Sequence, residues 1–187
     1  MGRRIVVVSG APGAGKSTLA APLAAALELP LFAKDTIKES LYDSLGDDGP
    51  ADLPTSRRLG AAAMGLLWRL ARDAPACVLE SNFRFPDEFA RPILWELAVG
   101  GAVVEVNCVC PAEEAARRYD ARGLTAERHR VHTLATLPAE VRAEYVEAIG
   151  VGTVIAVDTT KPVDVGALAA AVRAGLGSEF GTHRSGG

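Results

Sequence analysis

The residues best suited to chemistry lie in the first twenty positions. Residues 10–17 read Gly-Ala-Pro-Gly-Ala-Gly-Lys-Ser and match G-x-x-x-x-G-K-[ST], the phosphate-binding P-loop. The glycines allow positive φ and carry no Cβ, so successive backbone N–H groups can turn toward phosphate oxygens. Lys16 can reach the β- and γ-phosphates of a nucleotide, and the Ser17 hydroxyl can ligate Mg²⁺. The motif therefore predicts a nucleoside triphosphate site, formed by Gly10, Ala11, Pro12, Gly13, Ala14, Gly15, Lys16, Ser17 and Thr18.

Two carboxylates follow predicted strands. Asp35 lies between a predicted strand at 31–33 and a predicted helix at 36–45, and Glu80 ends a predicted strand at 77–80. The carboxyl ends of strands in an open α/β sheet face the ligand crevice, so both acids are candidate site residues. Asp35 could accept the proton of an attacking hydroxyl, although an aspartate here also suits a helix N-cap. Glu80 could orient Mg²⁺ through water, contact the substrate, cap a helix or remain solvated.

Further polar residues follow these acids along the chain. Lys38 lies one helical turn beyond Asp35 and could hold substrate or phosphate, while a solvated lysine fits the sequence equally well. Asn82 and Arg84 follow Glu80 and could line the pocket of a phosphate acceptor. These three side chains are therefore candidate substrate ligands.

Arginines are dense after the fourth predicted strand. The helix that follows Pro111 has acids early and arginines late, at 117, 118 and 122, which suits its dipole. We expect a lid over about residues 117–137 that closes over the triphosphate, with Arg118 or Arg122 neutralising charge in the transition state. The alternative is a solvated face of an arginine-rich protein.

Alternating strands and helices must position these residues. Strands are predicted at 5–8, 31–33, 77–80, 103–110 and 152–157. Helices are predicted from about 16 to 27 and at 36–45, 57–73, 87–99, from 111, at 138–149 and at 163–176. The 57–73 helix should bury Leu59, Ala62, Ala63, Leu66, Leu67 and Leu70. We therefore predict a three-layer α/β/α domain over 1–176 with a five-stranded parallel sheet, followed by a disordered tail at 177–187.

Composition narrows the function. The 187 residues are 49% hydrophobic and 23% charged, with a net charge of −3, which disfavours a dedicated nucleic-acid surface. No apolar run approaches the length of a membrane span, and no signal-peptide core precedes the first strand. Cys77, Cys108 and Cys110 lack metal-ligand spacing and suit buried positions in a reducing cytoplasm. We expect a cytoplasmic protein without membrane contact.

Other P-loop classes fit less well. A GTPase needs N-K-x-D after a late strand and D-x-x-G after the third strand, and the partial matches here are incomplete or misplaced. We expect a motor or AAA+ ATPase to need a longer chain. The P-loop class that remains is a small phosphotransferase.

The motif set also resembles a known family. Residues 10–18, the strand running into Lys34 and Asp35, the acid at Glu80 and the arginines at 117, 118 and 122 are similar to the polynucleotide-kinase-like and zeta-toxin-like P-loop kinases, which include chloramphenicol phosphotransferase. The similarity covers about residues 4–172. It implies dependence on ATP and Mg²⁺ and transfer of the γ-phosphate to a hydroxyl.

The resemblance assigns roles residue by residue. Asp35 matches the aspartate that activates the hydroxyl, Arg118 or Arg122 matches the lid arginines, and Glu80 matches an acid used for Mg²⁺ or substrate. Residues 158–162, with Thr160 and Pro162, resemble the loop that packs on adenine. Lys38 stands where polynucleotide kinases tend to carry an arginine.

We therefore expect an ATP-dependent kinase that acts on a hydroxyl of a small molecule. One alternative is a 5′-hydroxyl polynucleotide kinase, which the acidic composition disfavours. Another is an ATP-binding regulatory module that acts through a partner. The sequence leaves the acceptor and the oligomeric state open.

Overall fold

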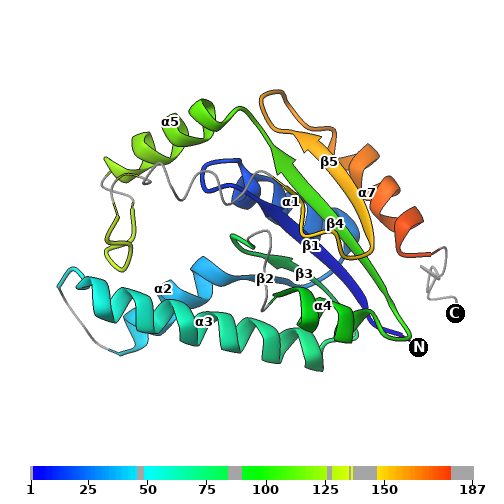
Figure 1. Ribbon diagram of the computed structural model, residues 1–187, viewed down its shortest axis with the longest axis horizontal. Helices are drawn as coiled ribbons and strands as arrows, with labels where there is room; N and C mark the ends of the chain where they lie inside the picture. Colours follow the sequence, from blue (N-terminus) through cyan, green and yellow to red (C-terminus); the bar gives the residue numbers. More distant parts are fainter. Residues whose placement is uncertain are drawn as a thin grey trace, which may run out of the picture.

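Five parallel strands form the predicted sheet in the part of the chain that this computed structural model describes, which is residues 2–45, 49–83, 90–125, 128–134, 136 and 147–177. The strand order is β2-β3-β1-β4-β5 (Figure 1). The strands are β1 (Arg4–Gly10), β2 (Leu31–Ala33), β3 (Ala76–Glu80), β4 (Ala102–Val109) and β5 (Thr153–Asp158). Residues 5–8 of the central strand β1 form a continuous apolar run because helices cover both faces of the sheet.

Helices alternate with the strands as predicted. They are α1 (Lys16–Leu27), α2 (Lys34–Ser44), α3 (Leu53–Asp73), α4 (Ala90–Ala98), α5 (Ala112–Gly123) and α7 (Val165–Gly175). The α3 helix begins four residues before the predicted start, because the Asp52 side chain accepts a 2.8 Å hydrogen bond from the Thr55 N–H and caps it. Most of the predicted 138–149 helix and nearly all of the predicted tail lie outside the described residues.

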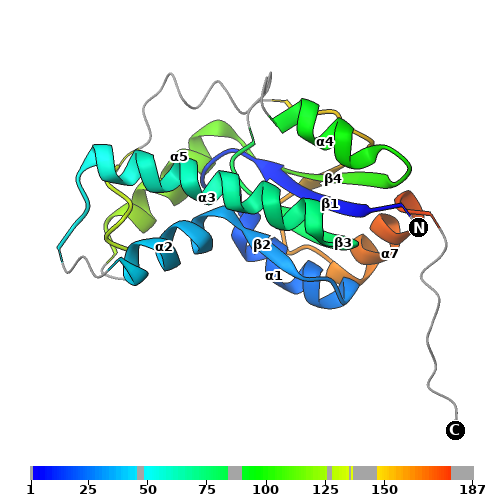
Figure 2. The same cartoon turned by 90° about the horizontal axis from the view of Figure 1, so that it is seen from below.

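Alternate side chains of the strands enter two separate cores. Val6 and Val8 of β1 pack with α1 and α7 on one face of the sheet, whereas Ile5 and Val7 pack with α3 and α4 on the other. Figure 2 shows these pairs of helices on opposite sides of the sheet. This is the predicted three-layer α/β/α arrangement.

The buried face of α3 differs from the predicted stripe. Ala62 is exposed and Leu66 is 41% exposed, so these two positions were predicted wrongly. The face that packs inward instead comprises Ser56, Leu59, Ala63, Leu67, Trp68 and Ala71. Pro22 lies within α1, beyond its first turn, at an exposed position.

The register of the sheet brings the candidate residues together. Glu80 at the end of β3 pairs with Val8 of β1 on one side and with Ala33 of β2 on the other. The loop that follows β1 and the start of α2 therefore flank Glu80 at the carboxyl edge of the sheet. Sheet register, rather than proximity in sequence, builds one site from these segments.

A buried carboxylate interrupts β4. Glu105 is 1% exposed and accepts hydrogen bonds from the Ser9 hydroxyl at 2.5 Å and from the N–H groups of Ile149 and Gly150, each at 2.9 Å. It thereby fastens the segment before β5 to the strand that leads into the P-loop. Sequence patterning showed only a polar residue in an apolar strand.

Among the described helices, none combines the length and the apolar character that crossing a membrane would require.

Candidate active site

The P-loop adopts a conformation that depends on its glycines. Gly13 and Gly15 have φ values of 86° and 81°, which side chains rarely tolerate. A Cβ on Gly13 would also lie 2.0 Å from the Ala115 carbonyl oxygen, so α5 packs directly against the loop. Because α1 begins at Lys16, its first N–H groups and its positive dipole end are directed at the loop. The loop is therefore built to receive an anion.

Lys16 is folded back onto its own loop. Its Nζ donates a 2.8 Å hydrogen bond to the Ala11 carbonyl, and the residue is only 5% exposed. Burial, partly offset by the charge of Glu80, lowers the pKa of Lys16 to about 8. The lysine is a nearly desolvated cation, and phosphate oxygens would compensate it.

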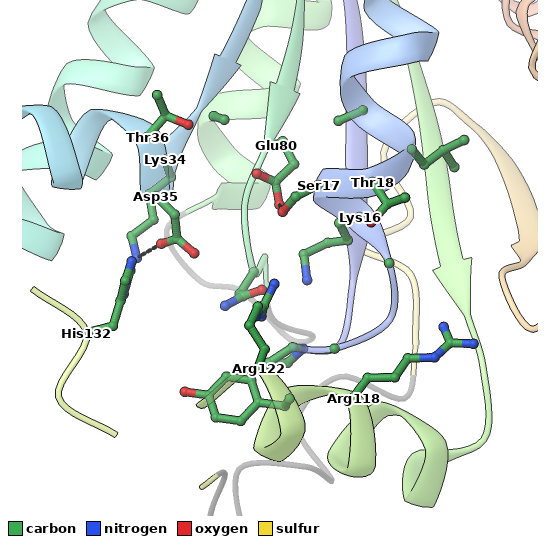
Figure 3. Close-up of a pocket in the computed structure, with 18 of the residues that line it drawn as sticks. Lys16, Ser17, Thr18, Lys34, Asp35, Thr36, Glu80, Arg118, Arg122 and His132 are labelled. Atoms are coloured by element: carbon green, nitrogen blue, oxygen red, sulfur yellow. Dashed lines mark hydrogen bonds and ion pairs between the residues drawn. The ribbon is translucent and has the colours of Figure 1, made fainter. Parts of the chain in front are cut away.

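Ser17 and Glu80 lie together on the floor of the cleft (Figure 3). The Ser17 hydroxyl is 3.4 Å from Glu80 Oε1, and Glu80 is 5% exposed. Burial, reinforced by the charge of Asp35, raises the pKa of Glu80 despite the proximity of Lys16. The Ser17 hydroxyl and the under-compensated Glu80 carboxylate are two hard oxygen ligands of the kind that Mg²⁺ prefers. The described residues contain no cluster of three or more His, Cys, Asp or Glu, so a metal here would also need phosphate or water ligands.

Asp35 lies across the cleft from the P-loop, within the first turn of α2, and Ala33 takes the N-cap position. Its carboxylate pairs with Lys34 Nζ at 2.8 Å, and 47% of its side chain is exposed. Partial burial alone would raise the pKa of Asp35, but Lys34 outweighs this and holds it below its ordinary value. The carboxylate is therefore ionised at neutral pH and can accept a hydrogen bond or a proton.

These residues line a single cleft of about 1190 Å³. Of the predicted site residues, it is lined by Pro12, Gly13, Gly15, Lys16, Ser17, Thr18, Asp35, Lys38, Glu80, Asn82, Arg118, Arg122 and Pro162. Four predicted residues are not among those that line it: Gly10, Ala11, Ala14 and Thr160. Arg84 lies outside the described residues.

The two candidate arginines of α5 point in different directions. Arg118 donates to Glu114 at 2.6 Å and to the Thr159 carbonyl at 3.2 Å, which directs it to the loop after β5. Arg122 points into the cleft toward Lys16 (Figure 3), and its charge contributes to lowering the pKa of Lys16. Arg122 is thus placed near the phosphate site and Arg118 near the loop predicted to contact adenine.

Thr159 was missed by sequence reasoning. Its hydroxyl donates to the Ala14 carbonyl at 2.9 Å, and its N–H donates to the Val109 carbonyl at 3.0 Å. Thr160 instead hydrogen-bonds Asp158 through its N–H and its hydroxyl, at 2.9 and 2.6 Å. Thr159 therefore ties the loop after β5 to the P-loop, and nothing in the Thr-Thr pair distinguishes the two residues.

The segment 128–134 forms the far wall of the cleft. His132 Nε2 lies 2.8 Å from Glu39 Oε1, and His129 Nε2 lies 3.1 Å from Asp43 Oδ1, so both histidines contact α2. Burial lowers the pKa of His132. Val131 is fully buried against α2 and α3. Figure 1 shows the segment descending from α5 to these helices.

A family described as AAA domain matches residues 5–143. No curated protein matches the sequence.

Three solved structures share the fold. A candidate kinase from Chloroflexus aurantiacus J-10-fl has a TM-score of 0.79 and 28% identity, covering 94% of this chain and 100% of its own. Shikimate kinase from Acinetobacter baumannii, in complex with shikimate, has a TM-score of 0.57 and 15% identity, covering 96% of each chain. A gluconokinase from Sinorhizobium meliloti 1021 has a TM-score of 0.53 and 21% identity, covering 93% and 91%.

These similarities bear out the predicted fold, whereas the narrower resemblance to polynucleotide kinases, zeta toxins and chloramphenicol phosphotransferase stays a prediction. The chain belongs to this AAA domain family and has the α/β fold of the P-loop kinases.

Proposed function

We propose that this protein is an ATP-dependent kinase that transfers the γ-phosphate of ATP to a hydroxyl of a small molecule. The observation that carries the proposal is the arrangement across one cleft. Lys16 and Ser17 occupy one wall, Asp35 faces them, and Glu80 lies between (Figure 3). A triphosphate held by the P-loop would direct its last phosphate toward Asp35.

The nucleotide side of the cleft has a defined role for each group. The N–H groups of the P-loop and of the first turn of α1 bind the phosphate oxygens, and Lys16 exchanges the Ala11 carbonyl for them. Ser17 and Glu80 would hold Mg²⁺, which supplies charge neutralisation on the phosphates when bound. Thr159, Pro162 and Arg118 lie where the loop after β5 borders the cleft and would contact the adenosine part.

On the side of the cleft that would hold the hydroxyl substrate, Asp35 is the proton acceptor. The acceptor oxygen attacks the γ-phosphorus, the bond between that phosphorus and the β–γ bridging oxygen breaks, and ADP leaves. The hydroxyl proton moves to the Asp35 carboxylate, which is ionised at neutral pH. Arg122 is placed to neutralise charge that develops on the transferred group.

The shape of the acceptor end favours a small molecule. Segment 128–134 spans from α5 to α2 and α3, where the Ser56 hydroxyl donates to the Val131 carbonyl at 2.7 Å and the Ala51 N–H donates to the Arg130 carbonyl at 3.2 Å. This wall borders the space beside Asp35. A polynucleotide would need an open path through it.

The test is ADP release from Mg-ATP with a panel of hydroxyl acceptors. Wild type should show acceptor-stimulated release, and Asp35→Asn should lose it by 10²-fold or more while it retains ATP binding. Ser40→Ala, an exposed change on the same helix, serves as the matched control and should behave as wild type. Full activity in folded, ATP-binding Asp35→Asn would overturn the role of Asp35.

The same assay separates the alternatives. A polynucleotide kinase would respond to 5′-hydroxyl oligonucleotides and bind them in a salt-sensitive manner. A regulatory module would bind ATP tightly, show no stimulation by any acceptor, and form a nucleotide-dependent complex with a partner. Either result would replace the small-molecule kinase proposal.

A further inference from the structure

Cations outnumber compensating carboxylates at the acceptor end of the cleft. Asp35 and Glu39 lie on this part of α2, where Asp35 pairs with Lys34 and Glu39 Oε1 lies 2.8 Å from His132 Nε2, an imidazole that carries charge only when protonated. The same wall carries Lys38, Arg57 and Arg128. Within the described ranges, no carboxylate lies within 4.0 Å of these three cationic groups. The site therefore contains positive charge that the described protein does not neutralise locally.

Lys38 is held in place although it is buried. The residue is 6% exposed, and its Nζ donates to the Ser56 hydroxyl at 2.7 Å. That hydroxyl gives its own proton to the Val131 carbonyl, so the serine accepts from Lys38 and fixes its position. The Lys38 ammonium has three N–H donors, and the Ser56 hydroxyl accepts a hydrogen bond from one of them. Burial, together with the nearby charge of Lys34, lowers the pKa of Lys38 and outweighs the opposing charges of Asp35 and Glu39.

Arg128 presents an unsatisfied donor on the same wall. Its guanidinium lies 5.0 Å from the centroid of the Tyr119 ring, and its Nη2 donates to the Tyr119 hydroxyl at 3.1 Å and to the Leu134 carbonyl. Its Nε is buried and has no hydrogen-bond partner among the described residues. The charge of Arg128 also contributes to lowering the pKa of Lys38, so the two groups act on one region. An unpaired buried donor is costly unless a ligand satisfies it.

We propose that the acceptor is a small hydroxylated anion, a carboxylate or a phosphate monoester, whose charged group binds Lys38 and Arg128 while its hydroxyl faces Asp35. This inference rests on the proposed kinase function and specifies its substrate class. Asp35 and Lys38 are three residues apart on α2, so they lie on one face with Cβ atoms about 5–6 Å apart. A ligand anion would offset the buried charge of Lys38 and would pair with the guanidinium charge of Arg128.

The test compares acceptors that differ chiefly in the anionic group. ADP release from Mg-ATP is measured with glycerol, glycerate and glycerol 3-phosphate, and with glucitol, gluconate and glucitol 6-phosphate. The anionic members should stimulate release at least tenfold more than their neutral partners. Comparison of the carboxylates with the phosphates shows which anion the site takes.

Variants identify the site that gives this preference. Lys38→Met should raise KM for the anionic acceptor about 10- to 100-fold, with a smaller effect on kcat and none on Kd for ATP. Arg128→Gln should also raise KM for the anionic acceptor. It provides the test if Lys38→Met does not fold. Arg69→Met removes an exposed charge from α3 and is the matched control. Equal rates with neutral and anionic acceptors, or an equal loss with both in Lys38→Met, would overturn the inference and leave the kinase intact.

Direct binding separates this inference from the kinase proposal. If no acceptor stimulates release, the kinase proposal fails, and anion binding is then measured by calorimetry on protein saturated with Mg-ADP, so that the P-loop is occupied. Glycerate, glycerol 3-phosphate and inorganic sulfate serve as probes. Binding that weakens at least tenfold in both Lys38→Met and Arg128→Gln would support the anion site. Absence of binding to wild type, or the same affinity in all three proteins, would overturn it.

Discussion

The ammonium of Lys16 donates a 2.8 Å hydrogen bond to the carbonyl of Ala11, five residues earlier in the same loop. The lysine that the motif assigns to phosphate therefore has a partner within the P-loop itself. A nucleotide must replace that carbonyl with better acceptors. Because the ammonium is also buried, its charge state and its ligand are linked.

This linkage predicts that ATP affinity falls at high pH. The free protein loses the Lys16 proton above pH about 8, whereas bound phosphates would keep the ammonium charged. The Kd for ATP should be nearly constant from pH 7 to 8 and then rise by up to tenfold per pH unit to pH 9.5, as measured by calorimetry.

The stability of the free protein should move in the opposite direction. The pKa of Lys16 is about 8 in the folded state against an ordinary value of 10.5, so the unfolded chain binds more protons within this window. This group therefore contributes stability that increases with pH between these values. Deprotonation of Lys16 therefore does not destabilise the protein at high pH, and a loss of ATP affinity there cannot be ascribed to unfolding caused by this group. Lys16→Arg keeps its charge and should show no such pH dependence, and a flat wild-type profile to pH 9.5 would contradict the prediction.

Glu80 should lower the stability of the free protein while it contributes to metal binding. The pKa of Glu80 is raised by burial, so ionised Glu80 costs folding free energy at neutral pH, since stability falls as pH rises from 4.5 through the raised pKa. Glu80→Gln should therefore raise Tm while it increases the Mg²⁺ concentration needed for half-maximal activity about tenfold. Thermal unfolding and Mg²⁺ titrations measure the two effects. Glu113→Gln, an exposed change on α5, is the control, and an unchanged Mg²⁺ requirement would exclude Glu80 from the metal site.

Substitutions of Arg122 and Arg118 should have different kinetic effects. Arg122 points toward Lys16, so Arg122→Met should lower kcat about 10²- to 10³-fold with little change in Kd for ATP. Arg118 contacts Glu114 and the Thr159 carbonyl, so Arg118→Met should mainly raise KM for ATP. Arg117→Met removes a guanidinium that is 69% exposed and should have neither effect. The reverse pattern would assign the transition-state role to Arg118.

Glu105 should be a major determinant of stability. Glu105→Leu removes the acceptor of the N–H groups of Ile149 and Gly150 and leaves the Ser9 hydroxyl only its longer 3.3 Å bond to Asn107 Oδ1, which should lower the free energy of unfolding by about 3 kcal/mol or more. Urea denaturation measures the loss. Glu105→Gln keeps one oxygen acceptor and should lose less, whereas Glu113→Leu, an exposed change, should stay within about 1 kcal/mol of wild type. Equal stability of Glu105→Leu and wild type would show that the three donors find other partners.

Short-range chemistry made much of this molecule predictable. The P-loop needs glycine at positions of positive φ, as at Gly13 and Gly15, and a strand and a helix must flank it. The alternation of strands and helices likewise implies a parallel sheet, because parallel strands require crossover connections. Asp35 and Glu80 could be placed at one edge of the sheet because each follows a strand.

Amphipathic periodicity was less informative where a helix is apolar over a broad arc. In α3 the residues at 59, 62, 63, 66, 67 and 70 are all apolar, so periodicity alone did not define the buried face. Packing against α2 and the sheet buried Leu59, Ala63 and Leu67 and left Leu66 exposed. Tertiary packing, rather than the periodicity of the helix, therefore determines which face of α3 is buried.

The sequence by itself determined the fold class, the phosphate loop and the acids beside it, because these follow from local backbone requirements and strand ends. Only the tertiary structure decided that Arg122 points at the phosphate site, that Thr159 lies over the P-loop and that Lys38 is buried at the acceptor end. Thr159 and Ala14 are 145 residues apart, and Lys38 and Ser56 are 18 apart. Contacts over such separations depend on how elements pack, and local propensity and periodicity carry no information about that packing.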